Sequence, residues 1–204
     1  MKQILIAAAA VLSLMASAAP AAPAAPSHLE QAVLAGGCFW GMEGLFEHVR
    51  GVRDVVSGYA GGAPGDATYG AVSTERTGHA EAVRITYDPA QISYWQLLKI
   101  YATVAHDPTE VNRQGPDTGT SYRSAIFPQN AAQKQAAASF LARLQASHIY
   151  SRPIATRIEG GGFFPAEAYH QGFMRRHPFY PYILVNDRPK LSKLKSAYPQ
   201  YWKA

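Results

Sequence analysis

Apolar residues along the chain switch between helical and strand spacing, which predicts an interleaved arrangement of helices and strands. Leu29–Ala35 is a short apolar run that ends in Gly36-Gly37, as expected for a strand that enters a tight turn. Phe39–Val49 carries apolar residues three or four positions apart, which predicts a helix. Val52–Ala60 and Ala82–Tyr87 have the β-branched content or the alternation typical of strands.

The second half of the sequence continues this succession. Ser93 followed by Gln96 has the pattern of a capping box, so a second helix is expected to begin there. Asn130 is expected to cap a third helix. That helix lies between strands predicted over Tyr122–Phe127 and Ile154–Ile158.

The order of these elements predicts the fold class. Two strands follow the first helix in succession, so the chain is not a strict βαβ repeat. We expect an α+β fold, a two-layer sandwich with a mixed β-sheet, rather than a doubly wound parallel sheet. The last forty residues, rich in Pro and Tyr, are expected to wrap the domain irregularly, with a terminal helix near 190–196.

The N-terminal residues differ in composition from this domain. A basic start, an apolar run over Ile4–Leu14 and the small residues Ala16-Ser17-Ala18 are typical of a secretory signal peptide. The run is shorter than the ~20 residues of a membrane span, so an uncleaved anchor is the less favoured alternative. We expect a periplasmic or secreted protein with a signal peptide over 1–18, an Ala/Pro-rich disordered spacer over 19–30 and a catalytic domain over 31–204.

Composition and charge exclude several function classes. The formal net charge is +5, but the basic residues are scattered and form no aromatic–basic motif, so a solvated basic surface is the better interpretation. The seven histidines have no metal-ligand spacing. A phosphate loop and a dinucleotide fingerprint are also missing from the sequence. We therefore expect no metal, no bound cofactor and no nucleic-acid partner.

Cys38 is the only cysteine, so the thiol is either buried and inert or reactive. It follows Gly36-Gly37 at the expected start of a helix, where unpaired backbone N–H groups and the helix dipole favour a thiolate. Phe39 and Trp40 come next and point about 100° apart on a helix, so at least one is free to line a pocket. Cys38 is the candidate nucleophile.

Other segments carry polar candidates. Glu81 stands where a polar loop becomes an apolar strand, where burial would raise its pKa; a surface glutamate is the alternative. His79 is either a base or a capping residue. Asp117 ends a long loop, as an orienting group or as part of a simple turn. Tyr69 and Tyr122 are possible hydrogen-bond donors, with ordinary packing as the alternative among 12 tyrosines.

Together these segments resemble the A-type peptide methionine sulfoxide reductase family. The motifs that carry the resemblance, in chain order, are G-C-F-W-G at 37–41, G-Y-x-G-G at 58–62, T-G-H-A-E at 77–81, Y-D-P at 87–89, H-D-P, R-Q-G, D-x-G-x-x-Y and R-S-A-I within 106–126, and F-F-P-A-E-x-Y-H-Q at 163–171. The resemblance spans nearly the whole chain from about 32 to 185. It implies a ferredoxin-like α+β sandwich and the reduction of methionine-S-sulfoxide, free or in proteins, to methionine, which repairs oxidised proteins.

The resemblance also implies a role for each candidate. Cys38 attacks the sulfoxide sulfur and becomes a sulfenic acid, and Glu81 provides the proton for the oxygen. The remaining residues line the substrate pocket: Phe39 and Trp40 on its apolar side, and Tyr69, Asp117 and Tyr122 on its polar side.

The sequence departs from many relatives in its thiols. Those relatives carry further cysteines near the C-terminus that attack the sulfenic acid, whereas Pro181–Ala204 contains none and position 73 is Ser73. We expect a form without resolving cysteines, in which an external thiol such as a thioredoxin-like donor or a dithiol reduces Cys38. The expected protein is a monomer that binds oxidised proteins or free methionine sulfoxide and has no membrane contact after signal cleavage.

Two other function classes stay open on the sequence alone. One is a cysteine hydrolase in which His79 or His170 is the base for Cys38, and which needs no reductant. The other is an exported binding module with a basic face and a buried, slowly alkylated Cys38.

Overall fold

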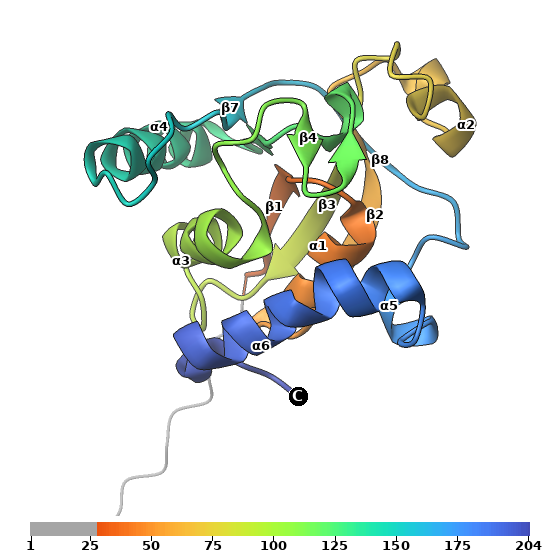
Figure 1. Cartoon of the computed structure of the whole chain (residues 1–204). Helices are drawn as coiled ribbons and strands as arrows, with labels where there is room; N and C mark the ends of the chain where they lie inside the picture. Colours follow the sequence, from red (N-terminus) through yellow and green to blue (C-terminus); the bar gives the residue numbers. More distant parts are fainter. Residues whose placement is uncertain (1–27) are drawn as a thin grey trace, which may run out of the picture.

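The computed structural model describes residues 28–204; the expected signal peptide and most of the expected spacer lie outside the described residues. One six-stranded sheet has the order β7-β6-β1-β3-β2-β8 (Figure 1). Neighbouring strands are antiparallel except β6 and β7, which are parallel, so the sheet is mixed as predicted. The strands are β1 (Glu30–Ala35), β2 (Val52–Ala60), β3 (Ala80–Tyr87), β6 (Ala125–Phe127), β7 (Arg157–Ile158) and β8 (Phe163–Pro165).

The helices of the described range differ widely in length. The α-helices are α1 (Phe39–Glu47), α2 (Tyr69–Val72), α3 (Tyr94–Ile100), α4 (Ala131–Ala146), α5 (Phe173–Arg176) and α6 (Arg188–Ala197). Between them lie the π-helical turns Tyr101–Ala105 and Ile183–Asp187, the 3-10 helices Pro64–Asp66, Thr120–Tyr122 and Pro199–Tyr201, and a hairpin of β4 (Arg113–Gln114) and β5 (Asp117–Thr118). Within 28–204, none of these helices has the length and apolar character needed to cross a membrane.

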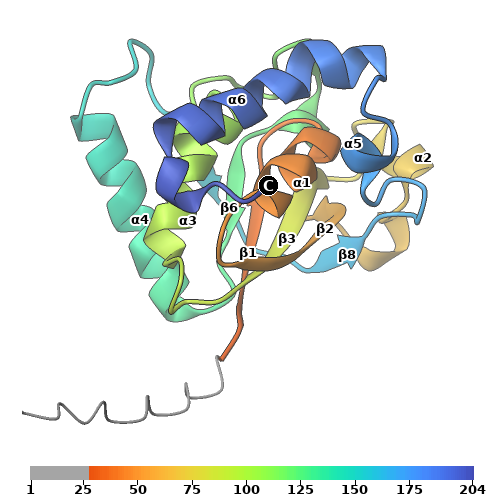
Figure 2. The same cartoon turned by 90° about the horizontal axis from the view of Figure 1, so that it is seen from below.

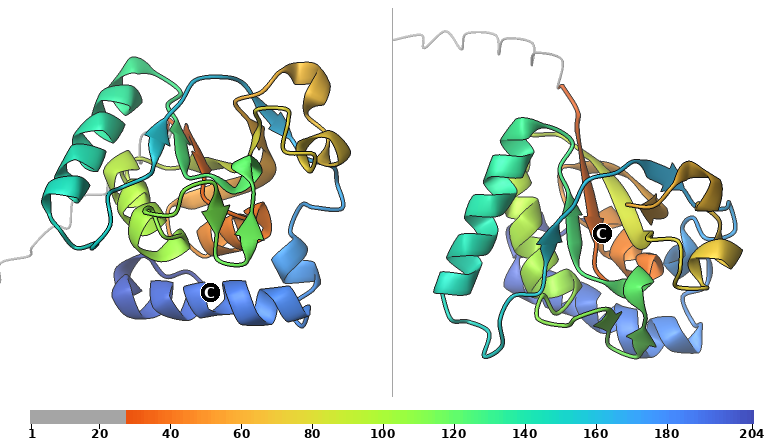
Figure 3. Two further views of the ribbon diagram at one scale, coloured as in Figure 1. Left: turned by 45° about the horizontal axis from the view of Figure 1, so that its top comes forward. Right: turned by 90° about the horizontal axis from the view of Figure 1, so that it is seen from above.

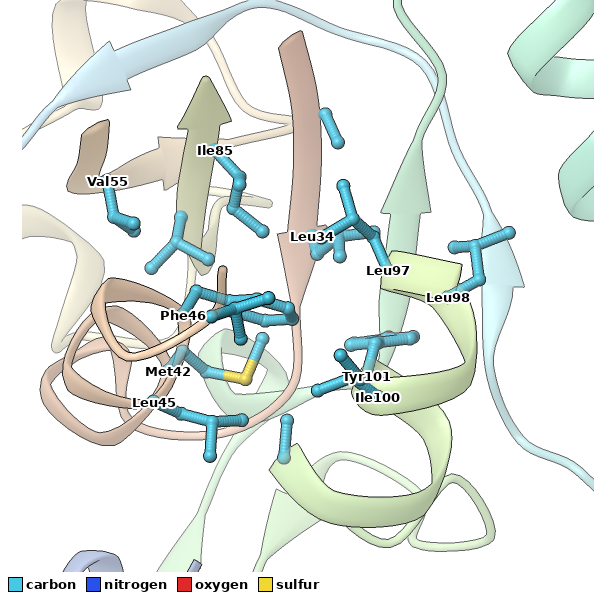
Figure 4. Close-up of a cluster of buried hydrophobic side chains, with 14 of the residues drawn as sticks. Leu34, Met42, Leu45, Phe46, Val55, Ile85, Leu97, Leu98, Ile100 and Tyr101 are labelled. Carbon is cyan, nitrogen blue, oxygen red and sulfur yellow. The ribbon is translucent and has the colours of Figure 1, made fainter. Parts of the chain in front are cut away.

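The main hydrophobic core lies between one face of the sheet and the helix layer. Val83 and Ile85 of β3 are fully buried in this core with Phe46 of α1 and residues of α3, α4 and α6. Figure 4 shows Ile85 near Phe46 and the side chains of Leu97 and Leu98 of α3. Figures 2 and 3 show α6 beside α1, with α4 at the other end of the layer. Because side chains alternate between the faces of a strand, Glu81 points toward the helices with Val83, and Ala82 points away.

Several predicted boundaries are confirmed. β2 has the predicted bounds, and β1 and α1 begin within one residue of the predicted positions. Ser93 caps α3 in a complete capping box: the Ser93 hydroxyl accepts from the Gln96 N–H at 3.3 Å, and Gln96 Oε1 accepts from the Ser93 N–H at 2.8 Å. Asn130 Oδ1 accepts from the backbone N–H of Gln133 at 2.8 Å and caps α4.

Other predicted elements are wrong in length or were missed. The strand predicted over Tyr122–Phe127 is restricted to β6, because Thr120–Tyr122 form a 3-10 turn whose hydroxyl and N–H groups bind the carboxylate of Glu75. The strand predicted over Ile154–Ile158 is restricted to β7. β8, which extends the sheet beside β2, was not among the predicted strands. The predicted terminal helix near 190–196 is confirmed, because α6 spans this range.

The diglycine turn between β1 and α1 rests on a buried polar network. Gly37 has φ +88°, a conformation that favours glycine, and a Cβ on Gly36 would lie 2.9 Å from the His106 ring. His106 is hydrogen-bonded through Nε2 to the Ser124 hydroxyl at 2.6 Å and through Nδ1 to the Tyr101 carbonyl at 2.9 Å. Burial lowers the pKa of His106 to about 4, so this ring is neutral beneath the turn that carries the thiol.

Candidate active site

Cys38 occupies the N-cap of α1 and is half buried. Burial raises the pKa of its thiol well above the ordinary value of 9.0, and the carboxyl groups of Glu81 and Asp187 raise it further. The N–H of Trp40 at the helix terminus lowers this pKa, but by less than those contributions raise it. Burial and the neighbouring carboxyl groups therefore oppose the preference for a thiolate that the helix N-terminus provides.

Glu81 lies directly under the N-terminus of α1. Its side chain is 4% exposed, and Oε2 accepts a hydrogen bond of 3.0 Å from the N–H of Phe39, the residue after the thiol. Burial raises the pKa of Glu81 to about 8, with a further contribution from Asp117, although the Phe39 N–H opposes the shift. The predicted burial of this carboxyl is confirmed, and at neutral pH the group is largely protonated.

An aromatic wall flanks the thiol on the side of Trp40. The Trp40 ring is half buried and stacks on Phe173 of α5, with ring centroids 3.7 Å apart. Its Nε1–H donates to Nδ1 of His170 at 3.0 Å. Phe39 is only 1% exposed and lies against His170 and Tyr59, with centroid distances of 4.8 and 5.8 Å. Of the two adjacent aromatic residues, Trp40 is thus the one that reaches the surface.

The predicted polar residues gather on the opposite side. Burial raises the pKa values of Tyr69 and Tyr122, and in both cases Glu81 and Cys38 raise them further, so both phenols lie within electrostatic range of the thiol and the acid. Asp117 accepts a hydrogen bond from the hydroxyl of Tyr182, and burial raises the pKa of Asp117. The structure therefore brings together all seven of the predicted site residues: Cys38, Phe39, Trp40, Tyr69, Glu81, Asp117 and Tyr122.

Sequence reasoning missed the side chains that hold these residues in place. Glu75 accepts from the Ser121 N–H at 2.8 Å and so fixes the turn that carries Tyr122. Glu167 accepts from the Tyr69 N–H at 2.8 Å and from the Tyr59 hydroxyl at 2.9 Å. Glu167 lies within the F-F-P-A-E-x-Y-H-Q motif, which was a usable signal.

Tyr182 and Asp187 were also missed. Burial and the charge of Cys38 raise the pKa of Tyr182, so this residue belongs to the site. Both residues come from the Pro/Tyr-rich tail, where nothing in the pattern separates Tyr182 from the other tyrosines.

The histidines do not form the pair that a cysteine hydrolase needs. His79 Nδ1 accepts from the Gly62 N–H at 3.2 Å, so its Nε2–H donates to the Ala63 carbonyl at 2.9 Å. His170 Nδ1 accepts from Trp40. Among the described residues neither ring is hydrogen-bonded to Cys38. In the same range, no three His, Cys, Asp or Glu side chains group in a way that would hold a metal ion.

Comparisons with known proteins agree on one family. The sequence profile of the family described as "Peptide methionine sulfoxide reductase" matches residues 30–202. The chain is 56% identical over 171 residues to "Peptide methionine sulfoxide reductase MsrA 2" of Mesorhizobium japonicum, covering 83% of this chain and 88% of that protein. It is 52% identical over 176 residues to the Synechocystis protein of the same description, and the match covers 86% of this chain and 82% of that protein.

Two solved structures share the fold. Reduced Mxr1 from Saccharomyces cerevisiae superposes with a TM-score of 0.68 at 32% identity, covering 76% of this chain and 90% of that one. Methionine sulfoxide reductase A of Corynebacterium diphtheriae superposes with a TM-score of 0.64 at 33% identity. The superposition covers 78% of this chain and 80% of that one.

Replacing Glu81 by Gln is expected to stabilise the protein at pH 8 by about 2–4 kcal/mol in free energy of unfolding. The amide of the introduced glutamine keeps an acceptor for the Phe39 N–H, and the buried ionisable carboxyl is removed. Because the folded-state pKa near 8 exceeds the unfolded value of 4.5, the stability that wild-type Glu81 contributes is present below pH 4.5 and is lost as the pH rises to 8.

Urea denaturation of both proteins between pH 4.5 and 8 measures this effect, and the gap in unfolding free energy should widen with pH. Asp54→Asn, which removes an exposed carboxylate, is the matched control and should show no such widening. A gap for Glu81→Gln that stays constant across the range would contradict the buried, protonated carboxyl.

Proposed function

Because the chain belongs to the peptide methionine sulfoxide reductase family and reduces methionine sulfoxide to methionine, we propose that Cys38 is its nucleophile and Glu81 its acid. One observation carries this assignment: a carboxyl group whose pKa is raised to about 8 lies buried under the first turn of the helix that bears the only thiol of the chain. A sulfoxide needs a soft nucleophile at sulfur and a proton donor at oxygen, and this turn holds both.

In the proposed reaction, Glu81 donates its proton to the sulfoxide oxygen while the sulfur of Cys38 attacks the sulfoxide sulfur. A bond forms between the two sulfur atoms, and the S–O bond of the substrate breaks, so that the oxygen leaves with the Glu81 proton as hydroxide. The hydroxide then attacks the Cys38 sulfur, the S–S bond breaks, methionine leaves, and Cys38 carries the oxygen as a sulfenic acid. The substrate sulfur gains two electrons, and the Cys38 sulfur loses two. The proton that leaves the thiol restores the carboxylic acid of Glu81, so the step needs no proton from solvent.

The two walls of the site suit the two sides of a sulfoxide. Trp40, held by Phe173 and His170 and underlain by Phe39, offers an apolar surface for the methyl group. The phenols of Tyr69 and Tyr122, with Asp117 nearby, offer polar contacts for the oxygen and the polar side of the substrate. Fixed apolar and polar walls around a tetrahedral sulfur accept one epimer, which we propose is the S form.

We further propose that an external thiol regenerates the enzyme. The chain has one cysteine, so no second thiol of its own can attack the sulfenic acid. The donor thiol displaces water from the sulfenic acid and forms a mixed disulfide with Cys38. A second donor thiol then attacks this disulfide, releases the Cys38 thiol and leaves oxidised donor. A thioredoxin-like protein or a small dithiol has this chemistry.

Separated S and R sulfoxides with a dithiol reductant test the assignment. Wild type is expected to form methionine from the S epimer alone, and Cys38→Ser is expected to form none. Glu81→Gln should lose about 100-fold or more in kcat, as is usual when a general acid is removed. Asp54→Asn is expected to keep wild-type activity. Turnover of the R epimer, or activity of Cys38→Ser, would sink the proposal.

A single-turnover experiment tests the external resolution step. With excess S sulfoxide and no reductant, the enzyme should release about one equivalent of methionine, because the sulfenic acid has no internal thiol to react with. Mass spectrometry after addition of dimedone should then find the adduct on Cys38, and a dithiol added first should abolish it. Continued turnover without reductant would contradict this step.

We propose that the protein is exported, on the strength of the basic start, the apolar run over Ile4–Leu14 and the Ala16-Ser17-Ala18 site. Expression of the full chain in a Gram-negative host should yield a shortened protein in the periplasmic fraction, with a new N-terminus close to residue 19. Recovery of the uncut chain from the cytoplasm would argue against export.

A further inference from the structure

Most of the large apolar side chains exposed on the surface belong to segments that surround Trp40. Between residues 28 and 204, the large apolar residues exposed to solvent are Leu29, Tyr69, Val111, Ile149, Tyr169, Phe179, Tyr180, Leu184 and Val185. Four of them lie within 179–185, between α5 and α6, and two more, Tyr69 and Tyr169, pack on His170, which is hydrogen-bonded to Trp40. We call these six residues the apolar patch. Single exposed apolar residues are normal, whereas a group of them in one place is typical of an interaction site.

Ring contacts join the apolar patch to the aromatic wall of the site. The Tyr180 ring meets the Trp40 ring edge-on, with centroids 6.2 Å apart. The rings of Tyr69 and Tyr169 lie 4.7 and 4.2 Å from that of His170, which accepts from the Trp40 indole. The apolar surface that starts at Trp40 therefore continues outward beyond the site.

The segment 179–185 is anchored from the inside. Ile183 is fully buried, and the Tyr182 hydroxyl donates to Asp117. Pro178 and Pro181 restrict the backbone on either side of the exposed aromatic pair. A partner that binds here meets a surface that is already ordered, so little conformational entropy of the protein is lost on binding.

The composition of this segment favours an apolar partner. From His177 to Val185 the chain contains no Asp, Glu, Lys or Arg. The nearby guanidinium of Arg176 donates to the carbonyl groups of Tyr169 and Gln171. A charged side chain placed on the segment would lose hydration without an opposite charge from it, whereas an apolar side chain would gain by leaving water.

We propose that the apolar patch binds the residues that flank methionine-S-sulfoxide in a polypeptide, so that the enzyme selects oxidised segments with apolar or aromatic neighbours. The inference rests on the proposed place of the sulfoxide methyl group against Trp40. The occupant is the substrate rather than the thiol donor, because the patch begins at the wall that the substrate contacts. An extended chain advances about 3.3–3.6 Å per residue. A residue about two positions from the sulfoxide therefore reaches Tyr180, whose ring is 6.2 Å from that of Trp40.

The same reasoning narrows the class of substrate. Segments rich in large apolar residues are mostly buried in folded proteins. The polypeptide that fits the patch is therefore an unfolded or locally opened oxidised chain, and free methionine sulfoxide makes no use of the patch.

Steady-state kinetics on matched peptides test the proposal, with dithiothreitol as the reductant so that no donor protein takes part. Two blocked pentapeptides carry a central methionine-S-sulfoxide, flanked by phenylalanine and leucine in one and by serine on both sides in the other. Wild type is expected to have about tenfold higher kcat/KM for the apolar peptide. Phe179→Ser and Leu184→Ser should each lower this value about threefold to tenfold without changing kcat. Both variants should keep wild-type kcat/KM for the serine peptide and for N-acetylmethionine S-sulfoxide.

Ile149→Ser is the matched control, because Ile149 is 61% exposed and follows α4. Figure 2 shows α4 and α5 on opposite sides of the molecule. This variant should treat both peptides as wild type does, and circular dichroism confirms folding of each variant.

Equal kcat/KM of wild type for the two peptides overturns the proposal, and so does an equal loss on both peptides in Phe179→Ser and Leu184→Ser. A loss that appears only with thioredoxin as the reductant assigns the patch to the donor and overturns it as well. Failure of the roles proposed for Cys38 and Glu81 would appear in the epimer assay, whereas the peptide comparison uses variants that retain both residues.

Discussion

The hydrogen bond from the Phe39 N–H to the buried carboxyl of Glu81 joins the two halves of the site. It spans 42 positions in the sequence and connects the first residue of α1 to β3, a central strand of the sheet. The bond exists because the pairing of β3 with β2 points Glu81 toward the helices, beside Tyr59 of β2. A shift of one residue in this register would turn Glu81 to the other face and leave the thiol without its acid.

Burial raises the pKa of both Glu81 and Cys38. In both cases neighbouring carboxyl groups add to the effect of burial: Asp117 acts on Glu81, and Glu81 and Asp187 act on Cys38.

The sequence predicts well whatever depends on local pattern, and less well what depends on distant contacts. The bounds of β2, the capping box at Ser93 and the burial of Glu81 follow from apolar spacing and from polar residues at element ends. The helix terminus at Cys38 is a local feature that the sequence reveals, whereas Asp187, which raises the pKa of Cys38, lies 149 positions away in the sequence. No periodicity identifies such a partner.

The C-terminal wrap completes the site rather than merely covering the domain. Glu43 in the middle of α1 is 2% exposed and accepts from the Ser57 hydroxyl of β2 and from the Gly172 N–H, both at 2.8 Å. Gly172 lies between His170 and Phe173, which hold Trp40. One buried carboxyl thus couples the nucleophile helix both to the sheet and to the segment that shapes the aromatic wall. Because a buried carboxyl left without its donors is costly, the helix, the sheet and the wrap hold their relative positions together. The aromatic wall at Trp40 and the carboxyl group of Glu81 therefore keep their positions on either side of Cys38.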